Sequence, residues 1–496
     1  ASNATVPSTI TLGKGAVLRN FGGMSAVRAT GAAKLVMESG SVIEDTPSIK
    51  RSSGAAGSVG PAGAVWLQGS SFEMEKGSEI KNVDGRAVYV DGGSVSVGGT
   101  ISGITGNPAM WQGEDGTAIH LRNKASGTLL SGGIIKEISG TKSSSAVYVH
   151  TSTLNCNEES KICNCDSVGI LSVYCDSNWN DGRNIVSFDG ELSGTLNNKN
   201  PFQIACTDLT IGKNAKIHGN STNYGALYLQ KNVTADIYGK IYENTASGRG
   251  GGIGTAGHGF VEINLYDGAE IKDNIANNTG GGLSLKNAKF VMHGGEISGN
   301  RSNNNVGGGV FLYEDAVAEL CGGTISNNTA GASDGGGGGV YVGEKCSFTM
   351  DGGTITGNTA TKGNGGGIYI HFNAGNVSIS NATITGNKAS ATGNTSYGHG
   401  GGIYSERGVT VKNVKITGNN STFAGGGIYG NGTIALTDAT VTGNNQYDVY
   451  YDGKESTTPE LTVSGSVKAG YYANNDWKLP IFVSGILSAD SVIRVG

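Results

Sequence analysis

The chain has 496 residues, of which 86 are glycine and only 7 are proline, and the glycines follow no strict Gly-X-Y period. This composition excludes collagen, and 37% hydrophobic residues are too many for a disordered chain. No apolar run approaches the roughly 18 residues of a transmembrane helix. We therefore expect a soluble, folded protein with no membrane insertion by this segment.

The charge balance gives no sign of a nucleic-acid partner. The chain carries 35 Lys plus Arg against 40 Asp plus Glu, a formal net charge of -5, and neither sign is gathered in blocks. Surfaces that bind nucleic acid are usually strongly basic. We therefore expect no nucleic acid among the partners.

In chain order, an apolar anchor residue recurs about every 27 residues, which is the signature of a repeat architecture. In the second half of the chain a glycine triplet precedes the anchor, as in Gly365-Gly-Gly-Ile368. The series starts near Val27 and continues through Val65, Val88, Ile119, Val147, Ile170, Phe202, Leu227, Ile253, Leu283, Val310, Val340, Ile368, Ile403, Ile428 and Val449.

A second marker lies between these anchors and consists of an aliphatic residue three positions before an asparagine. Nine copies follow one another: Ile217/Asn220, Ile241/Asn244, Ile271/Asn274, Ile297/Asn300, Ile325/Asn328, Ile355/Asn358, Ile384/Asn387, Ile416/Asn419 and Val441/Asn444. Short amide side chains are common at turns and stack well between successive strands. We expect the asparagines to form a ladder by bonding backbone groups or the asparagine of the next coil.

The repeat unit predicts an all-β fold, a single-stranded right-handed parallel β-helix of about 17 to 18 coils of roughly 27 residues. Its short runs alternate apolar and polar residues and are rich in Thr, Val, Ile and Tyr, as β-strands are. Handedness follows the general preference of parallel crossover connections. Glycine would serve at corners that need a positive φ.

We expect one β-helix domain over residues 1–496. In chain order, it comprises N-terminal coils with a Gly/Ser-rich insertion (1–63), regular coils (64–150), irregular Cys-rich coils (151–210), the most regular coils (211–450) and C-terminal coils (451–496).

Five of the seven cysteines lie close together, at Cys156, Cys163, Cys165, Cys175 and Cys206. This grouping favours a local disulfide staple. The alternative is a zinc site, but a single residue separates Cys163 from Cys165, whereas zinc knuckles usually have two. We expect no metal and no cofactor.

The residue that follows each anchor is aromatic in ten of fifteen coils, which predicts an aromatic row on one face of the sheet. Such a row could stabilise the sheet beneath the loops that follow each asparagine. It could also bind a glycan or a protein, since exposed rings bury ligand surface at low entropic cost. The candidate ligand-binding residues form its unbroken part: Phe311, Tyr341, Tyr369, Tyr404, Tyr429 and Tyr450.

A row of threonines, which includes Thr354, Thr356, Thr383 and Thr385, offers a further alternative, because a regular array of hydroxyls can match an ice lattice. Glu296, Lys272 and Lys415 interrupt this row. The preference of threonine for strands is enough to explain it.

The pairing of Gly-Gly-Gly-Ile-Tyr with Ile-Thr-Gly-Asn-Thr-Ala resembles the repeats of bacterial cell-surface right-handed parallel β-helix proteins. It is also similar to the GGA(I/V/L) plus FxxN repeats of polymorphic outer-membrane adhesins, although here the third residue is usually Gly and the Phe is Ile. The resemblance covers about residues 17–470. It implies a secreted or surface-attached adhesion protein and defines neither a ligand nor a catalytic residue.

Some polysaccharide-degrading enzymes share the β-helix, and Gly257-His-Gly259 and Gly398-His-Gly400 match a Gly-His-Gly fragment of polygalacturonase-like hydrolases. Glycoside hydrolysis needs a pair of carboxylates about 5 to 10 Å apart. The Asn-Thr-Asp, Asp-Asp and Arg-Ile-Lys elements of that family are missing here. A lyase or glycoside hydrolase is therefore the alternative function, and we expect no enzymatic activity and no catalytic residues.

The sequence thus predicts a non-catalytic extracellular adhesin or surface-presentation rod. Its partner would be a host or microbial surface glycan or protein, and the chain itself would be a monomer. Anchoring segments are expected outside this sequence.

Overall fold

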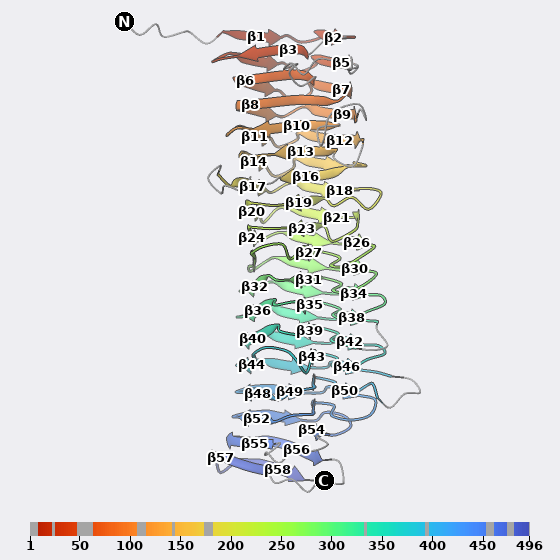
Figure 1. The fold of residues 1–496 in the computed structure, drawn as a ribbon, viewed down its shortest axis with the longest axis vertical. Coiled ribbons are helices and arrows are strands. Elements are labelled where there is room, and N and C mark those ends of the chain that lie inside the picture. The colour runs from red at the N-terminus through yellow and green to blue at the C-terminus, as the bar shows by residue number, and fades with distance from the viewer. Residues whose placement is uncertain are drawn as a thin grey trace, which may run out of the picture. The chain divides into compact units, whose positions relative to one another are not determined.

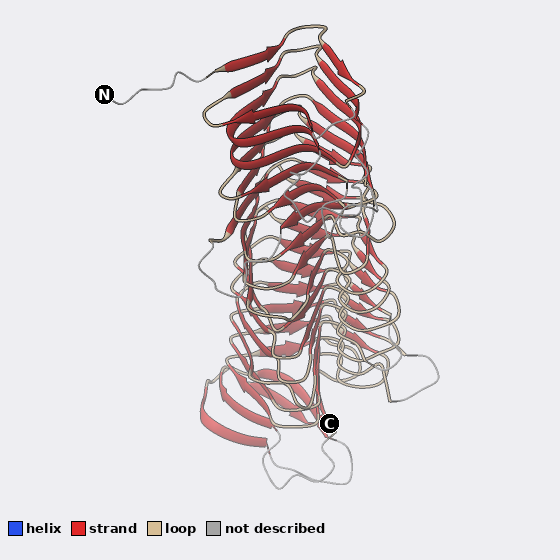
Figure 2. Cartoon of the chain, turned by 45° about the horizontal axis from the view of Figure 1, so that its top comes forward, coloured by secondary structure: helices blue, strands red, loops and turns tan. Residues whose placement is uncertain are grey.

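The computed structural model describes residues 8–21, 25–46, 63–106, 116–140, 144–172, 182–331, 335–391, 396–452, 461–473 and 481–495. In these residues the fold is all-β, a parallel β-solenoid of about 15 coils about 28 residues apart, and no helix is present. The coils are slightly fewer and longer than the sequence predicts. In the described part of the chain, Figure 2 shows strands joined by turns and loops.

The chain divides into two compact units. The first holds residues 1–222 and 227–235, and the second holds residues 223–226 and 236–496. In each unit the strands of successive coils pair in parallel and form rows, which Figure 1 labels coil by coil. Three rows recur from coil to coil. The anchor row contains the strands with the anchor residues, and the second row contains the strands that follow them along the chain. The asparagine row contains the strands that precede the asparagines.

The strands of the first unit fall into these three rows. Its anchor row holds β3 (Ser25–Thr30), β6 (Gly63–Met74), β8 (Arg86–Val97), β10 (Thr117–Arg122), β13 (Ser145–Val149), β16 (Val168–Ser172), β19 (Phe202–Ile204) and β23 (Leu227–Leu229). Its second row holds β1 (Thr9–Leu12), β4 (Lys34–Met37), the later parts of β6 and β8, β11 (Ser126–Leu129), β14 (Thr153–Cys156), β17 (Asn184–Phe188) and β20 (Thr207–Ile211). Its asparagine row holds β2 (Val17–Arg19), β5 (Val42–Thr46), β7 (Glu79–Asp84), β9 (Thr100–Thr105), β12 (Ile134–Ser139), β15 (Lys161–Cys163), β18 (Glu191–Ser193) and β21 (Lys216–His218), and is followed by β22 (Ser221–Thr222).

The boundary between the two units falls within β24 (Val233–Ile237), and the strands of the second unit form the same three rows. Its anchor row holds β27 (Ile253–Thr255), β31 (Leu283–Lys286), β35 (Val310–Tyr313), β39 (Val340–Val342), β43 (Ile368–Ile370), β47 (Ile403–Ser405), β51 (Ile428–Gly430), β54 (Val449–Tyr451) and part of β56 (Lys468–Ala473). Its second row holds β28 (Val261–Leu265), β32 (Lys289–Met292), β36 (Val317–Leu320), β40 (Ser347–Asp351), β44 (Val377–Ser380), β48 (Val409–Lys412), β52 (Ile434–Thr437), β55 (Leu461–Gly465) and β57 (Ile481–Leu487).

The asparagine row of the second unit holds β25 (Lys240–Tyr242), β29 (Glu270–Lys272), β33 (Glu296–Ser298), β37 (Thr324–Ser326), β41 (Thr354–Thr356), β45 (Thr383–Thr385), β49 (Lys415–Thr417), β53 (Thr440–Thr442), the first part of β56 and β58 (Val492–Val495). Two-residue strands follow the asparagines: β26 (Thr245–Ala246), β30 (Ile275–Ala276), β34 (Arg301–Ser302), β38 (Thr329–Ala330), β42 (Thr359–Ala360), β46 (Lys388–Ala389) and β50 (Asn420–Ser421).

The predicted anchor series is confirmed within each unit. In the first unit, Val27 pairs with Val65 and the register continues from anchor to anchor as far as Leu227. In the second unit it runs from Ile253 to Val449. From Val65 onward the anchors point inward and are buried, because alternate side chains of a strand face opposite sides, whereas Val27 in the first coils is only partly buried. The predicted Gly/Ser-rich insertion lies almost wholly outside the described residues.

The glycine triplet has a steric cause at each of its positions. Gly365 has φ +64°, a left-handed conformation that glycine adopts without strain. A Cβ on Gly366 would lie 2.5 Å from the carbonyl oxygen of Gly401 in the next coil. A Cβ on Gly367 would lie 2.6 Å from the carbonyl oxygen of Gly402. Any side chain here would therefore collide with the backbone of the neighbouring coil.

The predicted asparagine ladder is present in the second unit. The Oδ1 of Asn300 accepts hydrogen bonds from the backbone N–H and from the Nδ2 of Asn274, both at 3.0 Å. The Nδ2 of Asn300 donates to Asn328 at 3.0 Å and to the Ile271 carbonyl at 2.8 Å. The same amide-to-amide bonds link Asn244, Asn274, Asn300, Asn328, Asn358, Asn387, Asn419 and Asn444.

The ladder ends at a carboxylate. Asn444 donates its backbone N–H and its Nδ2 to Asp448 Oδ1, at 2.9 and 3.0 Å. In the first unit, Asn220 lies in the same kind of corner, where it donates to the Leu192 carbonyl at 3.3 Å and accepts from the Thr195 N–H at 2.9 Å. Buried polar groups are tolerated when they are hydrogen-bonded in this way.

We predict that Asn328→Ala destabilises the second unit by about 3 kcal/mol, because it leaves buried donors and a carbonyl without partners. The backbone N–H of Asn300 donates to Asn328 Oδ1 at 2.9 Å. In the variant this amide should exchange its hydrogen faster, and the urea midpoint should fall.

The matched control is Asn304→Ala, because Asn304 is exposed and donates only to the Asn277 carbonyl at 3.0 Å. Its effect on stability should stay within about 0.5 kcal/mol. Unchanged exchange at Asn300 in Asn328→Ala would contradict a stabilising role for the ladder.

Candidate functional site

The predicted aromatic row exists, and its successive tyrosine rings stack. The residues Phe311, Tyr341, Tyr369, Tyr404, Tyr429 and Tyr450 pair in register on successive strands β35, β39, β43, β47, β51 and β54. The distances between successive ring centroids are 5.3, 4.7, 5.0, 5.1 and 5.3 Å. Tyr472 of β56 extends the row, 5.3 Å beyond Tyr450. We call this set of seven rings the aromatic ladder.

The aromatic ladder is buried at its centre. Tyr369, Tyr404 and Tyr429 are only 6, 8 and 5% exposed and form a cluster with Ala424, whereas Phe311, Tyr341 and Tyr450 are half-buried. These rings point away from the solenoid interior, as the sequence predicts. Segments that follow the asparagines cover the central rings, which agrees with the stabilising interpretation of the row. Only the ends of the ladder offer ring surface to a ligand.

His399 belongs to one of these covering segments. Its ring centroid lies 4.6 Å from that of Tyr429 and 5.8 Å from that of Phe423. Its backbone N–H donates to Asn364 Oδ1 at 2.9 Å. His399 of the Gly-His-Gly fragment therefore packs against the ladder.

Two carboxylates bond the phenol groups of the ladder. Tyr369 donates its hydroxyl to Glu406 at 2.7 Å, and Tyr429 donates to Asp452 at 2.5 Å. Burial, and then the hydrogen bond to the carboxylate, raise the pKa of Tyr369 and of Tyr429 well above the usual range. Burial raises the pKa of Tyr341 and of Tyr450 to about 12. The phenols therefore stay neutral at physiological pH.

The ladder stops at Phe311 because the preceding coil places Ser284 at the equivalent position. Phe311 instead stacks on Tyr313 of the same strand, with ring centroids 5.0 Å apart. Tyr313 accepts a hydrogen bond from Arg249 at 3.2 Å, and its ring lies 5.9 Å from the ammonium group of Lys286. We call Arg249, Lys286, Phe311, Tyr313 and Glu314 the basic end of the ladder.

Lys286 is charged at the basic end. Its ammonium group pairs with Glu314 at 2.7 Å. The hydrogen bond with Glu314, against the opposing effect of burial, raises the pKa of Lys286. Sequence reasoning missed this cluster, because Arg249 and Tyr313 are 64 residues apart. The coil period is the signal that could have brought them together.

At the other end of the ladder an exposed tyrosine joins the stack. The ring of Tyr447 is 45% exposed, and its centroid lies 4.3 Å from that of Tyr472 and 5.8 Å from that of Tyr450. Gln446 and Tyr447 both have positive φ, +55° and +70°. Such a conformation is uncommon for these residue types and costs conformational energy.

The first unit contains a shorter aromatic row. Trp66, Tyr89, His120 and Tyr148 lie on β6, β8, β10 and β13, with successive centroids 6.4, 5.0 and 4.3 Å apart. Burial, and then the nearby charge of Arg86, lower the pKa of His120 well below its usual range. His120 is therefore neutral at physiological pH and packs as a ring.

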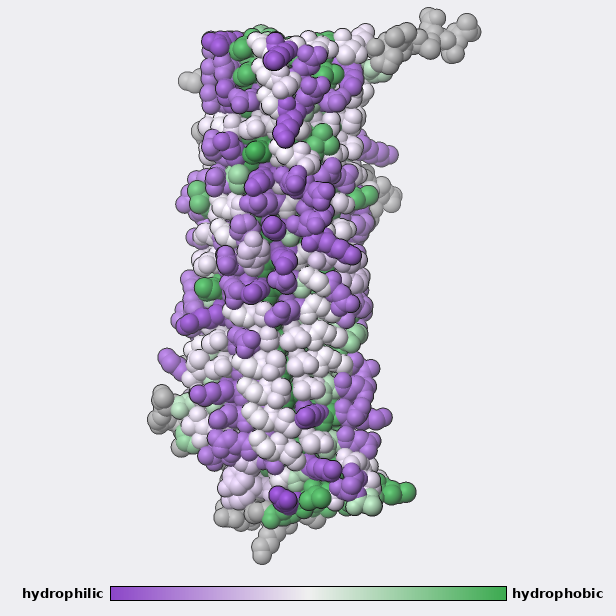
Figure 3. Space-filling view, turned by 180° about the vertical axis from the view of Figure 1, so that it is seen from behind, coloured by the Kyte–Doolittle hydropathy of each residue, from purple (hydrophilic) through white to green (hydrophobic). Residues whose placement is uncertain are grey.

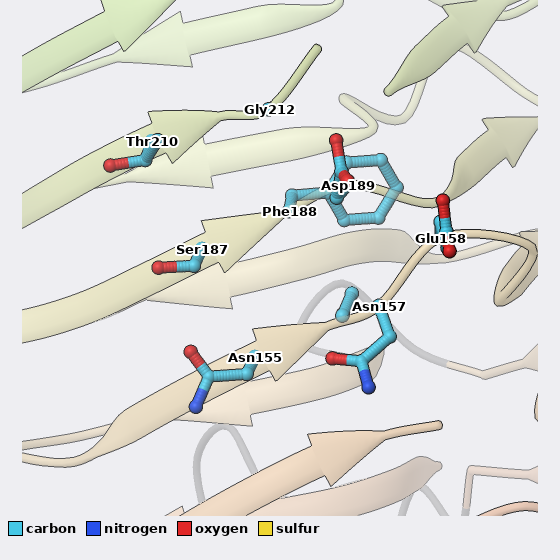
Figure 4. Close-up of a pocket in the computed structure, with 9 residues that line it drawn as sticks. Asn155, Asn157, Glu158, Ser187, Phe188, Asp189, Thr210 and Gly212 are labelled. Carbon is cyan, nitrogen blue, oxygen red and sulfur yellow. The ribbon is translucent and has the colours of Figure 1, made fainter. Parts of the chain in front are cut away.

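A polar hollow of about 540 Å³ lies on the second row of the first unit. Figure 4 shows Asn155, Ser187 and Thr210 side by side on β14, β17 and β20, with Glu158 and Asp189 beyond the strand ends. Asn214 donates its backbone N–H and its Nδ2 to the Asp189 carboxylate, at 2.8 and 2.9 Å. The hollow can offer hydrogen bonds to a ligand, but the carboxylate at its edge already has protein partners.

The threonine row is in register but incomplete. Thr354 pairs with Thr383, and Thr356 pairs with Thr385, whereas Lys415 follows Thr383 in the next coil. Thr385 donates its hydroxyl to the carbonyl of Thr417 at 2.7 Å. Some of the hydroxyls that an ice lattice would need are therefore engaged within the protein.

The cysteine prediction is wrong for three of its five residues. Cys156, Cys163 and Cys165 are free thiols, while Cys206 is disulfide-bonded and Cys175 lies outside the described residues. The second row buries Cys156, and burial raises the pKa of the Cys156 and Cys165 thiols to about 12. Burial thus keeps these thiols apart from the solvent and unreactive.

The described residues contain no group of three or more His, Cys, Asp or Glu side chains that could hold a metal ion. His258, the other histidine of a Gly-His-Gly fragment, is exposed on the loop before β28.

The described part of the chain also has no helix long and apolar enough to cross a membrane. The face drawn in Figure 3 is mostly hydrophilic or near neutral, with small scattered hydrophobic areas.

Comparison with known proteins adds no family assignment. No protein-family model matches this chain, and no curated protein matches it either. The parallel β-solenoid therefore rests on the structure, and the resemblance to adhesin repeats rests on the sequence motifs.

We predict that the protein loses stability as the pH rises above 10. The ordinary tyrosine pKa of 10.0 applies to the unfolded chain, whereas Tyr341 and Tyr450 in the folded chain titrate at about 12. A tyrosine pKa that is higher in the folded chain than in the unfolded chain stabilises the fold fully at pH values below the pKa of the unfolded chain. That contribution is lost as the pH rises through the pKa of the folded chain. Urea midpoints should stay unchanged from neutral pH to about pH 10 and should fall between about pH 10 and pH 12.

The phenolate absorbance should rise later in the folded chain than in urea. In Tyr341→Phe, which keeps the ring but removes the titrating group, the fall in midpoint should be shallower. Ionisation of all tyrosines near pH 10 without loss of structure would contradict the burial of the ladder.

Proposed function

We propose that the chain is a non-catalytic surface protein that binds host or microbial glycans at the ends of the aromatic ladder. The observation that carries the proposal is the contrast along the ladder. Three central rings are 5 to 8% exposed, whereas the end rings remain partly exposed and stand beside polar and charged groups. Aromatic rings with a few adjacent hydrogen-bonding groups are typical of sites that bind small polar ligands.

The exposed tyrosine supports a binding role. Tyr447 keeps its ring in the solvent on a backbone with two consecutive positive φ values. Backbone strain of this kind is concentrated at functional sites. The ring stacks on Tyr472 at 4.3 Å, so it is held in place before a ligand arrives.

An extracellular, bacterial, adhesin-like setting and a monomeric state belong to the same proposal. The glycine-triplet and asparagine repeats, which resemble those of bacterial surface β-helix proteins, support the setting. The disulfide at Cys206 agrees with an oxidising compartment.

Binding can be tested on a glycan array with the purified chain and three variants. We predict that Tyr447→Ala and Tyr450→Ala each weaken binding about tenfold or more, as expected for a central aromatic contact. Phe260→Ala is the matched control, because Phe260 is 58% exposed and lies outside the ladder. It should bind like the unmodified chain.

The enzyme alternative is tested on the same samples by a reducing-end assay with acidic polysaccharides. Binding without turnover agrees with the proposal. Turnover that is lost in His258→Ala or His399→Ala would overturn it, as would glycan binding unaffected by both tyrosine variants.

A further inference from the structure

The basic end of the ladder combines aromatic rings with two cations. The Arg249 guanidinium carbon lies 5.2 Å from the Tyr313 ring centroid, and the Lys286 ammonium lies 5.9 Å from it. Phe311 stacks on the same tyrosine at 5.0 Å. These residues come from three successive coils, so the cluster extends on the order of 10 Å along the coil direction.

The charges at this end do not cancel. Glu314 pairs with Lys286 at 2.7 Å. Arg249 is exposed, and no carboxylate among the described residues comes within ion-pair distance of it. Its Nη1 donates to the Tyr313 hydroxyl at 3.2 Å, a contact that orients the guanidinium and leaves its other N–H groups available to a ligand.

We propose that the basic end binds a carboxylate-bearing glycan, in which Arg249 holds a sugar carboxylate and the rings of Phe311 and Tyr313 contact the sugar ring. A guanidinium matches a carboxylate with two parallel hydrogen bonds, and an adjacent ring surface suits the apolar face of a sugar. Lys286 is already paired with Glu314, so Arg249 supplies the net positive charge for the sugar carboxylate. This inference rests on the proposed function and names the ligand class for one end of the same ladder.

Among the described residues, carboxylates stand at the opposite end of the ladder. There Asp452 accepts the Tyr429 hydroxyl at 2.5 Å, and Asp448 closes the asparagine ladder. An acidic ligand would be repelled by these carboxylates and attracted to Arg249. Charge complementarity therefore assigns the acidic glycan to the basic end.

The test compares three probes on the immobilised chain. They are an oligomer of galacturonic acid, the same oligomer with its carboxyl groups reduced to alcohols, and a sialylated oligosaccharide. We expect binding of at least one acidic probe, a loss of about tenfold or more when the carboxyl groups are reduced, and weaker binding as salt is added. The two acidic probes distinguish a polyuronate from a terminal acidic sugar.

Three variants locate the site. Arg249→Gln should weaken binding of the acidic probe about tenfold, and Arg249→Lys should weaken it less, because lysine keeps the charge without the fork of donors. Arg301→Gln is the matched control, because Arg301 is an exposed arginine of β34 outside the ladder. An unchanged urea midpoint in each variant confirms that the fold is intact.

The outcomes separate this inference from the proposed function. Equal binding of the acidic and the reduced oligomer, or unchanged binding in Arg249→Gln, overturns the inference. If neutral glycans still bind and Tyr450→Ala weakens them, the proposed function stands and only the acidic ligand class fails. If no glycan of any kind binds, both fail.

Discussion

The stacking of identical side chains from one coil onto the next is the constraint on which the rest of this structure depends. In the second unit it takes the form of buried amides, each of which accepts two N–H groups from the preceding asparagine. The third glycine of the triplet belongs to the same arrangement, because a Cβ on Gly367 would lie 3.2 Å from Asn387. Any shift in register would leave these buried amides without partners. The asparagine ladder and the glycine triplet therefore together determine where every outward side chain lies.

The aromatic ladder follows from that register. Once the anchors pair, the residues that follow them must lie about one strand spacing apart, which is close to the stacking distance of aromatic rings. Stacking alone does not decide whether the ladder is structural or functional. That depends on the segments after each asparagine, which bury Tyr369, Tyr404 and Tyr429 and leave the rings at both ends partly exposed.

The sequence predicts well whatever recurs in every coil and poorly whatever occurs once. The anchors, the asparagines and the aromatic row recur, so periodicity reveals them. The sequence indicates that the loops after each asparagine could cover the aromatic row, but it does not show which rings are buried, because those segments vary in length and composition from coil to coil. The free thiols of Cys156 and Cys165 are mispredicted because nearness in sequence does not bring sulfurs together. Cys156 is buried on β14, and Cys165 is buried separately after β15. The contact between Arg249 and Tyr313 spans two coils of unequal length, so a simple spacing rule does not find it.

Departures from the repeat are therefore the best indication of function in a fold of this kind. A residue that repeats in every coil is explained by stacking with its neighbours and needs no ligand. Ser284 ends the ladder where an aromatic residue would otherwise continue it, and this lets Phe311 turn to Tyr313. Tyr447 keeps an exposed ring on a backbone conformation that its residue type disfavours. Both features depart from the repeat and lie where the aromatic ladder meets solvent, which is why the proposed ligand sites are placed there.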